Sequence, residues 1–134
     1  MPGAEVFFDT SVLLYLLSGD AAKADRVEAL VADGGNLSVQ VLNEFAAVAR
    51  GKLALSFGEI REILATVRSL CHVHPLTSET HDRALFLAER YKFSVYDSAI
   101  IASAILADCT RLYAEDLQHR QRIGQRLAVI NPFL

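Results

Sequence analysis

Residues 5–17 read EVFFDTSVLLYLL, and this stretch decides the fold class of the chain. Val6, Phe7 and Phe8 form an apolar triplet that ends at Asp9, as expected of a buried strand that stops at a polar site. Residues 11–17 follow directly and are predicted to form a helix. The chain therefore opens with a strand, an acidic residue and a helix, in that order.

The same alternation of strands and helices continues to the end of the chain. We predict further helices over residues 21–32, 39–50, 57–70, 77–91 and 96–107, and further strands over residues 36–38, 71–76, 111–114 and 127–130. This alternation favours an α/β fold with a parallel sheet covered by helices, in which ligands collect outside the carboxyl ends of the strands. Asp9 and Asp116 each follow a predicted strand and are expected at that edge.

Length and composition place the chain among compact single domains. A chain of 134 residues, 52% hydrophobic and 22% charged, is expected to form one domain over residues 1–134 with a buried core. The longest apolar runs fall well short of the ~20 residues that span a bilayer, and the N-terminus lacks a basic start. We therefore expect no membrane segment, a cytoplasmic location, and buried, unpaired Cys71 and Cys109.

The net charge of -3 and the isoelectric point near 5.8 argue against nucleic-acid binding through bulk electrostatics. That objection weakens if the acidic residues gather where cations neutralise them. Two acids are indeed predicted to point inward. Glu44 lies beside an apolar helical stripe, and Asp97 heads another; the stripes contain Val41, Phe45 and Val48, and Ile100, Ile101, Ala104 and Ile105.

Several buried carboxylates near one another raise each other's pKa until protons or cations neutralise them. Oxygen ligands without accompanying cysteine suit Mg²⁺ or Mn²⁺ rather than Zn²⁺. We therefore predict a metal site built from four acids, whose helix and strand ends an α/β sheet would bring to one edge. They are Asp9, Glu44, Asp97 and Asp116.

Each acid also has a purely structural interpretation. Ser94 and Asp97 fit a capping box before an apolar helix. Asp116 could cap a short helix after it, and Asp9 could simply end a strand. Glu44 alone has no capping role, and the four acids together are harder to explain in this way than any one of them.

Four short patches resemble the PIN-domain family and, within it, the VapC toxins of toxin-antitoxin pairs. The patches occur in the family's order and spacing and are FDTSVLL (8–14), QVLNEF (40–45), YDSAIIA (96–102) and LYAEDL (112–117), with NPF (131–133) closing the chain. The resemblance implies an α/β/α sandwich with a central parallel sheet and hydrolysis of RNA. It also implies Mg²⁺ or Mn²⁺ at the four acids, a homodimer, and a cognate antitoxin that blocks the acidic groove.

Two positions depart from the family's pattern. Ala114 stands where Ser or Thr is common, and Ser11 stands where Asn is frequent. Both positions support the carboxylates and are not carboxylates themselves. The departures therefore bear on substrate positioning and rate more than on the class of reaction.

Metal-bound carboxylates can activate water for in-line attack on phosphorus and stabilise the leaving oxygen. We assign Asp9, Asp97 and Asp116 as the principal ligands and Glu44 as a ligand or as the acceptor of the water's proton. The neighbouring hydroxyls of Thr10 and Ser11 are predicted to orient Asp9 or contact a phosphate, or to cap the next helix. Basic residues near Asp116 predict a positive rim, with Arg120 and Arg122 as candidate RNA contacts; the others are Arg111, His119 and Arg126.

Other classes of protein use a similar acidic site. A receiver domain needs paired acids after the first strand and a lysine on a late strand, whereas Thr10 and Ser11 follow Asp9 and no late-strand lysine is predicted. A haloacid-dehalogenase phosphatase would need a second acid at the position of Ser11. A PIN-like scaffold without activity remains the third alternative, although all four acids are present.

Overall fold

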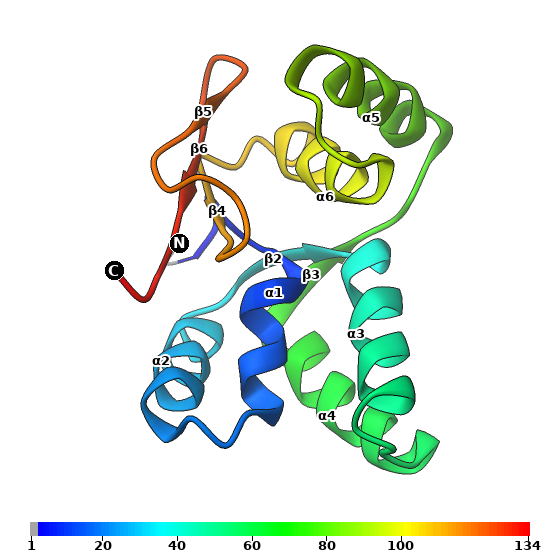
Figure 1. Cartoon of the computed structure of the whole chain (residues 1–134), viewed down its shortest axis with the longest axis vertical. Helices are drawn as coiled ribbons and strands as arrows, with labels where there is room; N and C mark the ends of the chain where they lie inside the picture. Colours follow the sequence, from blue (N-terminus) through cyan, green and yellow to red (C-terminus); the bar gives the residue numbers. More distant parts are fainter. Residues whose placement is uncertain (1–2) are drawn as a thin grey trace.

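The computed structural model describes residues 3–134 and contains a six-stranded sheet between two layers of helices (Figure 1). The strand order is β3-β2-β1-β4-β6-β5, and all neighbouring strands are parallel except β5 and β6. The predicted three-layer α/β/α sandwich with a mostly parallel sheet is confirmed.

The elements alternate along the chain as the hydrophobic pattern predicts. They are β1 (Val6–Phe8), α1 (Thr10–Leu13), η1 (Leu14–Leu17), α2 (Ala21–Ala32), β2 (Gly35–Ser38), α3 (Val39–Gly51), α4 (Phe57–Leu70), β3 (Cys71–His74), α5 (Ser78–Tyr91), α6 (Val95–Leu106), β4 (Arg111–Tyr113), β5 (Arg122–Ile123) and β6 (Leu127–Ile130).

The order of the strands creates a crevice at one edge of the sheet. From β1 the chain continues outward through β2 to β3, and then returns to the other side of β1 as β4. In Figure 1, α1 to α4 lie on one face of the sheet, and α5 and α6 lie on the other. The chain after β1 and the chain after β4 therefore run toward opposite edges of the sheet. In α/β folds, ligands bind beyond the carboxyl ends of two neighbouring strands that have this arrangement.

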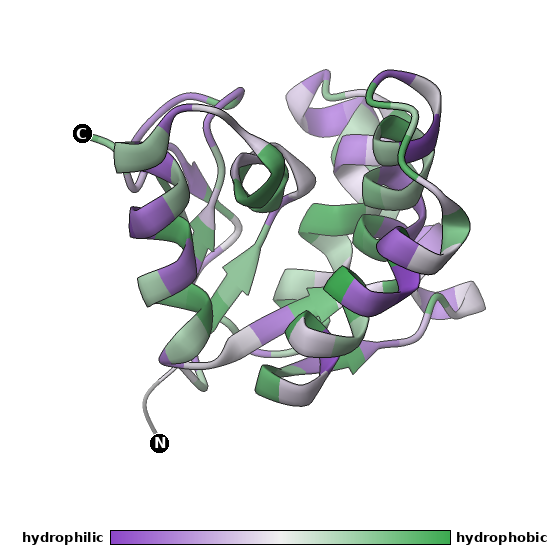
Figure 2. Cartoon of the chain, turned by 90° about the horizontal axis from the view of Figure 1, so that it is seen from below, coloured by the Kyte–Doolittle hydropathy of each residue, from purple (hydrophilic) through white to green (hydrophobic). Residues whose placement is uncertain are grey.

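The core consists of the strands and the inner faces of the helices. Phe7, Phe8 and Leu112 of the two central strands are fully buried, as are Ile100 and Ile101 of α6. Figure 2 shows the strands as mostly apolar, whereas the outer helices alternate between apolar and polar residues. The strongly apolar composition of α6 is explained by its position between α5 and the sheet.

Three differences from the sequence predictions have local causes. The predicted helix over residues 11–17 is divided into α1 and the 3₁₀ turn η1. The strand predicted over residues 71–76 ends at His74, since Pro75 has no amide hydrogen to donate to a neighbouring strand. The short β5 was missed because two residues show no alternation; Gly124, at φ 65°, turns the chain into β6.

Two further expectations concern the cysteines and membranes. Cys71 and Cys109 are both buried and unpaired, as predicted. Across residues 3–134, no helix combines the length and the apolar character that crossing a membrane requires.

Candidate active site

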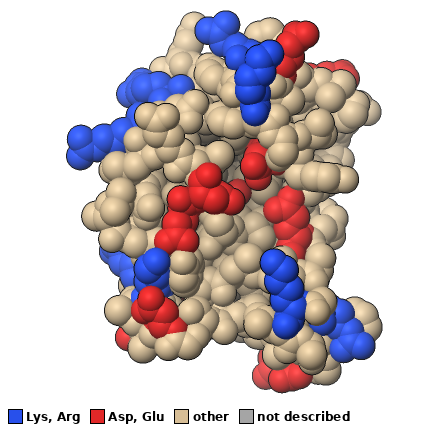
Figure 3. All heavy atoms as spheres, viewed as in Figure 1, with Lys and Arg blue, Asp and Glu red and all other residues tan. Residues whose placement is uncertain are grey.

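The four predicted acids line one pocket, of about 490 Å³, at the carboxyl ends of the strands. Asp9 directly follows β1, and Asp116 lies beyond the end of the neighbouring β4. Glu44 projects from α3, and Asp97 lies in the first turn of α6. Figure 3 shows acidic side chains on both sides of a hollow in the middle of this face. Residues far apart in the sequence are therefore brought to a single site.

Asp9 is the most deeply buried of the four acids, with 4% of its surface exposed. It forms the N-cap of α1, and its Oδ2 accepts hydrogen bonds from the backbone nitrogen of Ser11, at 3.1 Å, and from the Ser11 hydroxyl. Burial, together with repulsion from Asp116 and Asp97, raises the pKa of Asp9 to about 7 despite these hydrogen bonds. The capping role and a place in the acidic pocket thus occur together.

Ser11 joins Asp9 to the loop that carries Asp116. Its hydroxyl donates to Asp9 and accepts a hydrogen bond from the backbone nitrogen of Glu115 at 3.2 Å. Ser11 is therefore placed to orient Asp9, as one of its predicted roles requires.

The loop after β4 is held by a second set of contacts, around Glu115. This carboxylate accepts hydrogen bonds from the Tyr15 hydroxyl and from Lys23 Nζ, the latter at 3.0 Å. Lys23 Nζ also lies 4.8 Å from the ring centre of Tyr15 and 4.9 Å from that of Phe133. Glu115 is thus paired outside the pocket, which leaves Asp116 as the acid of this loop that faces it.

Glu44 is half-buried and held at both carboxylate oxygens. Thr10 Oγ1 donates to Oε1 at 2.9 Å, and Gln40 Nε2 donates to Oε2 at 2.8 Å. The predicted contact between Thr10 and Asp9 is therefore replaced by one between Thr10 and Glu44. Two donors that converge on one carboxylate fix its position at the wall of the pocket.

In the described part of the chain, the side chains of Asp97 and Asp116 do not make the helix-capping hydrogen bonds that their purely structural interpretations required. The Ser94 hydroxyl accepts from the backbone nitrogen of Asp97 at 3.0 Å, but within residues 3–134 the Asp97 carboxylate does not complete a capping box by accepting from the Ser94 backbone nitrogen. Burial, then repulsion from Asp116 and from Glu44, raises the pKa of Asp97 although the Ser94 side chain acts to lower it. No helix begins after Asp116 in the described chain, so the capping interpretation of Asp116 is wrong.

The donor set of the pocket fits a hard divalent cation. It offers carboxylate oxygens, and the pKa shifts show that the acids repel one another. Across residues 3–134, no three Asp, Glu, His or Cys side chains are close enough to hold one ion as they stand. Asp116 is exposed and Asp97 is half-buried, so both carboxylates are accessible from solvent.

The basic residues expected around Asp116 are more dispersed than predicted. Arg120 and Arg122 are exposed, and neither lines the acidic pocket. Arg111 pairs with Glu5 at 3.0 Å, and Arg126 lies 3.6 Å from Asp108. Both pairs lie at the amino end of β4, so the predicted rim is wrong for Arg111 and Arg126. RNA contact by Arg120 or Arg122 stays a prediction.

Some residues of the site received no role from the sequence. Gln40 lies one helical turn before Glu44, and that spacing could have identified it as a donor to the carboxylate. Tyr96 lines the pocket beside Asp97 with 69% of its surface exposed. Lys23 and Tyr15 reach Glu115 only through the tertiary fold, and no local pattern indicates this contact.

A family model described as PIN domain matches residues 6–123, and the chain therefore belongs to the PIN domain family. No curated protein matches the chain in sequence.

Among solved structures, the chain is similar to VapC20 of Mycobacterium tuberculosis, described as a sarcin-ricin loop cleaving toxin. That match has a TM-score of 0.68 at 20% identity and covers 83% of this chain and 89% of the toxin. A toxin-antitoxin complex from Klebsiella pneumoniae matches with a TM-score of 0.71 at 21% identity, over 95% and 97% of the two chains.

VapBC2 of Rickettsia felis, bound to a DNA fragment from its promoter, matches with a TM-score of 0.64 at 16% identity. The match covers 92% of this chain and 96% of the other. At these identities the structural likeness establishes the fold.

The buried state of Asp9 predicts that Asp9→Asn removes a pH dependence from the free energy of unfolding in metal-free buffer. The pKa of about 7 in the folded chain lies above the ordinary value of 3.8, so the stability contributed by protonated Asp9 is complete below about pH 4. It is lost as the pH rises through about 7. At about 1.4 kcal/mol per pKa unit, the unmodified chain should lose on the order of 4 kcal/mol relative to Asp9→Asn by pH 8.

Urea unfolding in EDTA between pH 4 and 8, in steps of about one unit, measures this difference. Asp82→Asn, at an exposed position of α5, is the matched control and should keep the pH dependence of the unmodified chain. A stability difference between the unmodified chain and Asp9→Asn that stays constant across this range would contradict the assigned burial of the charge.

Proposed function

We propose that the protein is a divalent-metal-dependent endoribonuclease that hydrolyses RNA phosphodiester bonds. The observation that carries the proposal is the convergence of four carboxylates in one pocket where the connections from β1 and β4 diverge. Membership of the PIN domain family supports it. Further support comes from the structural neighbour VapC20, which is described as a toxin that cleaves the sarcin-ricin loop.

In this proposal Asp9, Asp97 and Asp116 hold Mg²⁺ or Mn²⁺, and Glu44 is a further ligand or accepts the proton of the attacking water. The bound cation would lower the pKa of that water and stabilise the departing oxygen. Asp9 is the anchor, because its burial and the hydrogen bonds from Ser11 fix its position. Asp97 and Asp116, which line the same pocket, would supply the further carboxylate oxygens.

The supporting polar residues set the geometry of the carboxylates. Thr10 and Gln40 each donate a hydrogen bond to one carboxylate oxygen of Glu44. These two hydrogen bonds fix the orientation of the Glu44 carboxylate. Ser11 fixes Asp9 relative to the loop of Asp116. The Ser11 hydroxyl donates one hydrogen bond to Asp9 and accepts another from the backbone nitrogen of Glu115. Ser11 therefore makes a polar connection at a position where the family frequently has Asn.

We further propose that the protein is the toxin of a toxin-antitoxin pair. Two of the structural neighbours support this, since one is a toxin-antitoxin complex and the other is VapBC2. The cognate antitoxin would block the acidic pocket, with a basic side chain placed among the four carboxylates. Assembly as a homodimer and location in the cytoplasm belong to the same proposal.

Substitution of single acids should abolish cleavage of RNA. With purified protein and a labelled total-RNA pool, the unmodified chain should cut in Mg²⁺ or Mn²⁺ and not in EDTA. Asp9→Asn and Asp97→Asn should each reduce the rate by about 100-fold or more, because each removes a ligand charge from the site. Asp82→Asn should cut at the unmodified rate.

The outcomes separate the proposal from its alternatives. Cuts that persist in both site variants or in EDTA would refute the assigned site. Binding of Mg²⁺ or Mn²⁺ without any cleavage would favour a receiver-like or inactive PIN-like module instead.

Removal of a single hydroxyl tests the positioning of Glu44. Thr10→Val keeps the volume of the buried side chain but removes the donor to Oε1 of Glu44. We expect a fall of about 10–100-fold in metal affinity or activity, as for other residues that orient a metal ligand. Titration of cleavage rate against Mn²⁺ concentration measures it. Thr66→Val, on the exposed face of α4, is the control; equal effects of the two substitutions would refute the role of Thr10.

A further inference from the structure

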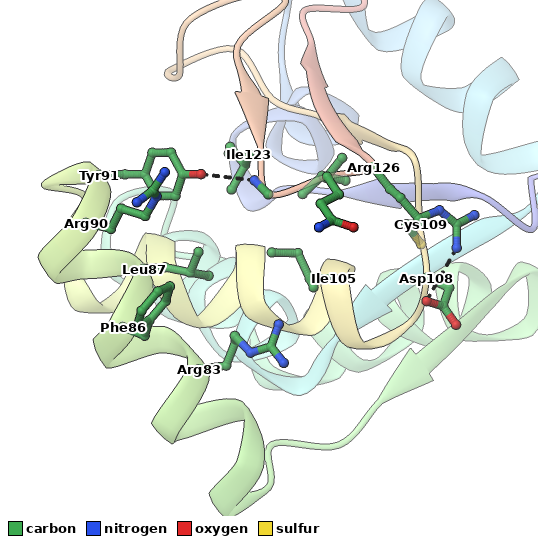
Figure 4. A pocket seen from close by; sticks show the side chains of 13 residues that line it. Arg83, Phe86, Leu87, Arg90, Tyr91, Ile105, Asp108, Cys109, Ile123 and Arg126 are labelled. Carbon is green, nitrogen blue, oxygen red and sulfur yellow. Dashed lines mark hydrogen bonds and ion pairs between the residues drawn. The ribbon is translucent and has the colours of Figure 1, made fainter.

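A second pocket, of about 570 Å³, lies apart from the acidic one and shares no lining residue with it. It is formed by α5, by the C-terminal part of α6 and its following turn, and by the hairpin of β5 and β6. Figure 4 shows α6 running between α5 and this hairpin, with Ile105 projecting into the gap. We call this the arginine groove, after Arg83, Arg90 and Arg126, which line it.

The charge of the arginine groove is positive. Arg83, Arg90 and Arg126 line it with a single carboxylate, that of Asp108. Asp108 lies 3.6 Å from Arg126, and both side chains of this pair are largely exposed, so the attraction is screened by solvent. Within residues 3–134, Arg83 and Arg90 form no ion pair. Two guanidinium groups are therefore available to an anion.

Aromatic side chains accompany these arginines. Phe86 lines the groove with 59% of its surface exposed, so its ring is accessible to a ligand. The guanidinium of Arg90 lies 5.4 Å from the ring centre of Tyr91, and the Tyr91 hydroxyl accepts from the backbone nitrogen of Gly124 at 3.0 Å. Tyr91 thereby fixes the hairpin to the end of α5, which holds the groove in a defined shape.

The arginine groove and the acidic pocket lie at opposite ends of α6. Tyr91 lies at the end of α5, close in sequence to Tyr96 and Asp97 of the acidic pocket at the start of α6. Asp108 follows the other end of α6, about 17 Å away at 1.5 Å per helical residue. A stacked nucleic-acid strand carries a phosphate about every 3.4 Å, so this path matches roughly five nucleotides. One strand could therefore reach both sites.

We propose that the arginine groove binds a single-stranded segment of the RNA substrate that flanks the bond cleaved in the acidic pocket. The proposal rests on the proposed ribonuclease function. A polyanion approaching four carboxylates needs compensating positive charge elsewhere on the protein, because the net charge is -3. Guanidinium groups pair with phosphate oxygens through two parallel hydrogen bonds, and exposed aromatic rings stack on bases of any sequence.

A pair of substitutions with a matched control tests this assignment. Arg83→Gln with Arg90→Gln removes two charges spaced seven residues apart on α5. Arg61→Gln with Arg68→Gln removes the same charge at the same spacing on α4, where both side chains are exposed and neither lines either of the two pockets. The two double variants therefore have equal net charge, and a difference between them reports position.

The measurement is fluorescence anisotropy of a labelled single-stranded 12-nucleotide RNA, in EDTA, over a series of salt concentrations. The groove variant should bind about 10-fold more weakly, and the slope of log affinity against log salt should fall by about 1.4, which is 0.7 for each lost phosphate contact. The control variant should keep the unmodified slope. Arg126→Gln, in the hairpin, should lower the slope by about 0.7 and tests the groove independently of α5.

The alternative outcomes are distinct. Equal weakening by both double variants would show a bulk charge effect and overturn the proposal, as would unchanged binding in the groove variant. If the groove variant binds RNA normally but loses a labelled Asp- and Glu-rich peptide, the groove receives an acidic protein segment instead. Absence of cleavage in Mn²⁺, with the predicted loss of binding intact, would refute the nuclease and leave the RNA groove standing.

Discussion

The carboxylate of Asp9 is almost fully buried without a basic partner among the described residues, and the rest of the site is arranged around this cost. A charge removed from water must be solvated by the protein, protonated, or paired with a cation. Ser11 supplies part of the solvation through two hydrogen bonds. Burial, to which the neighbouring Asp116 and Asp97 add repulsion, raises the pKa of Asp9 to about 7. In the proposed function, a divalent cation would neutralise these three carboxylates together.

The sheet explains why this concentration of charge occurs at one place. Asp9 and Asp116 follow adjacent parallel strands, and β1 pairs with β4 from Val6 opposite Arg111 to Phe8 opposite Tyr113. Glu44 and Asp97 enter from helices on opposite faces of the sheet. The aligned strand ends and the divergence of the connections thus bring together acids that are up to 107 residues apart. Glu115 is kept out of the pocket by Tyr15 and Lys23, which limits the cluster to four acids.

The sequence predicts most of the elements and the gathering of four acids at one place, because both follow from local patterns. The buried apolar triplet before Asp9 and the positions of the half-buried Glu44 and Asp97 at the pocket follow from strand and helix periodicity. The rest depends on contacts that periodicity does not encode. The bond from Thr10 to Glu44 and the pairing of Arg111 with Glu5 join residues from distant parts of the chain.

The most direct test of the metal site is the position of Mn²⁺ in crystals grown near pH 7.5 and soaked with the ion. Anomalous diffraction would locate the metal independently of any activity. We predict a peak in the acidic pocket, with oxygens of Asp9 and at least one of Asp97 and Asp116 within about 2.5 Å. A peak elsewhere, or an acidic pocket that stays without metal while its carboxylates are ionised, would contradict the central claim.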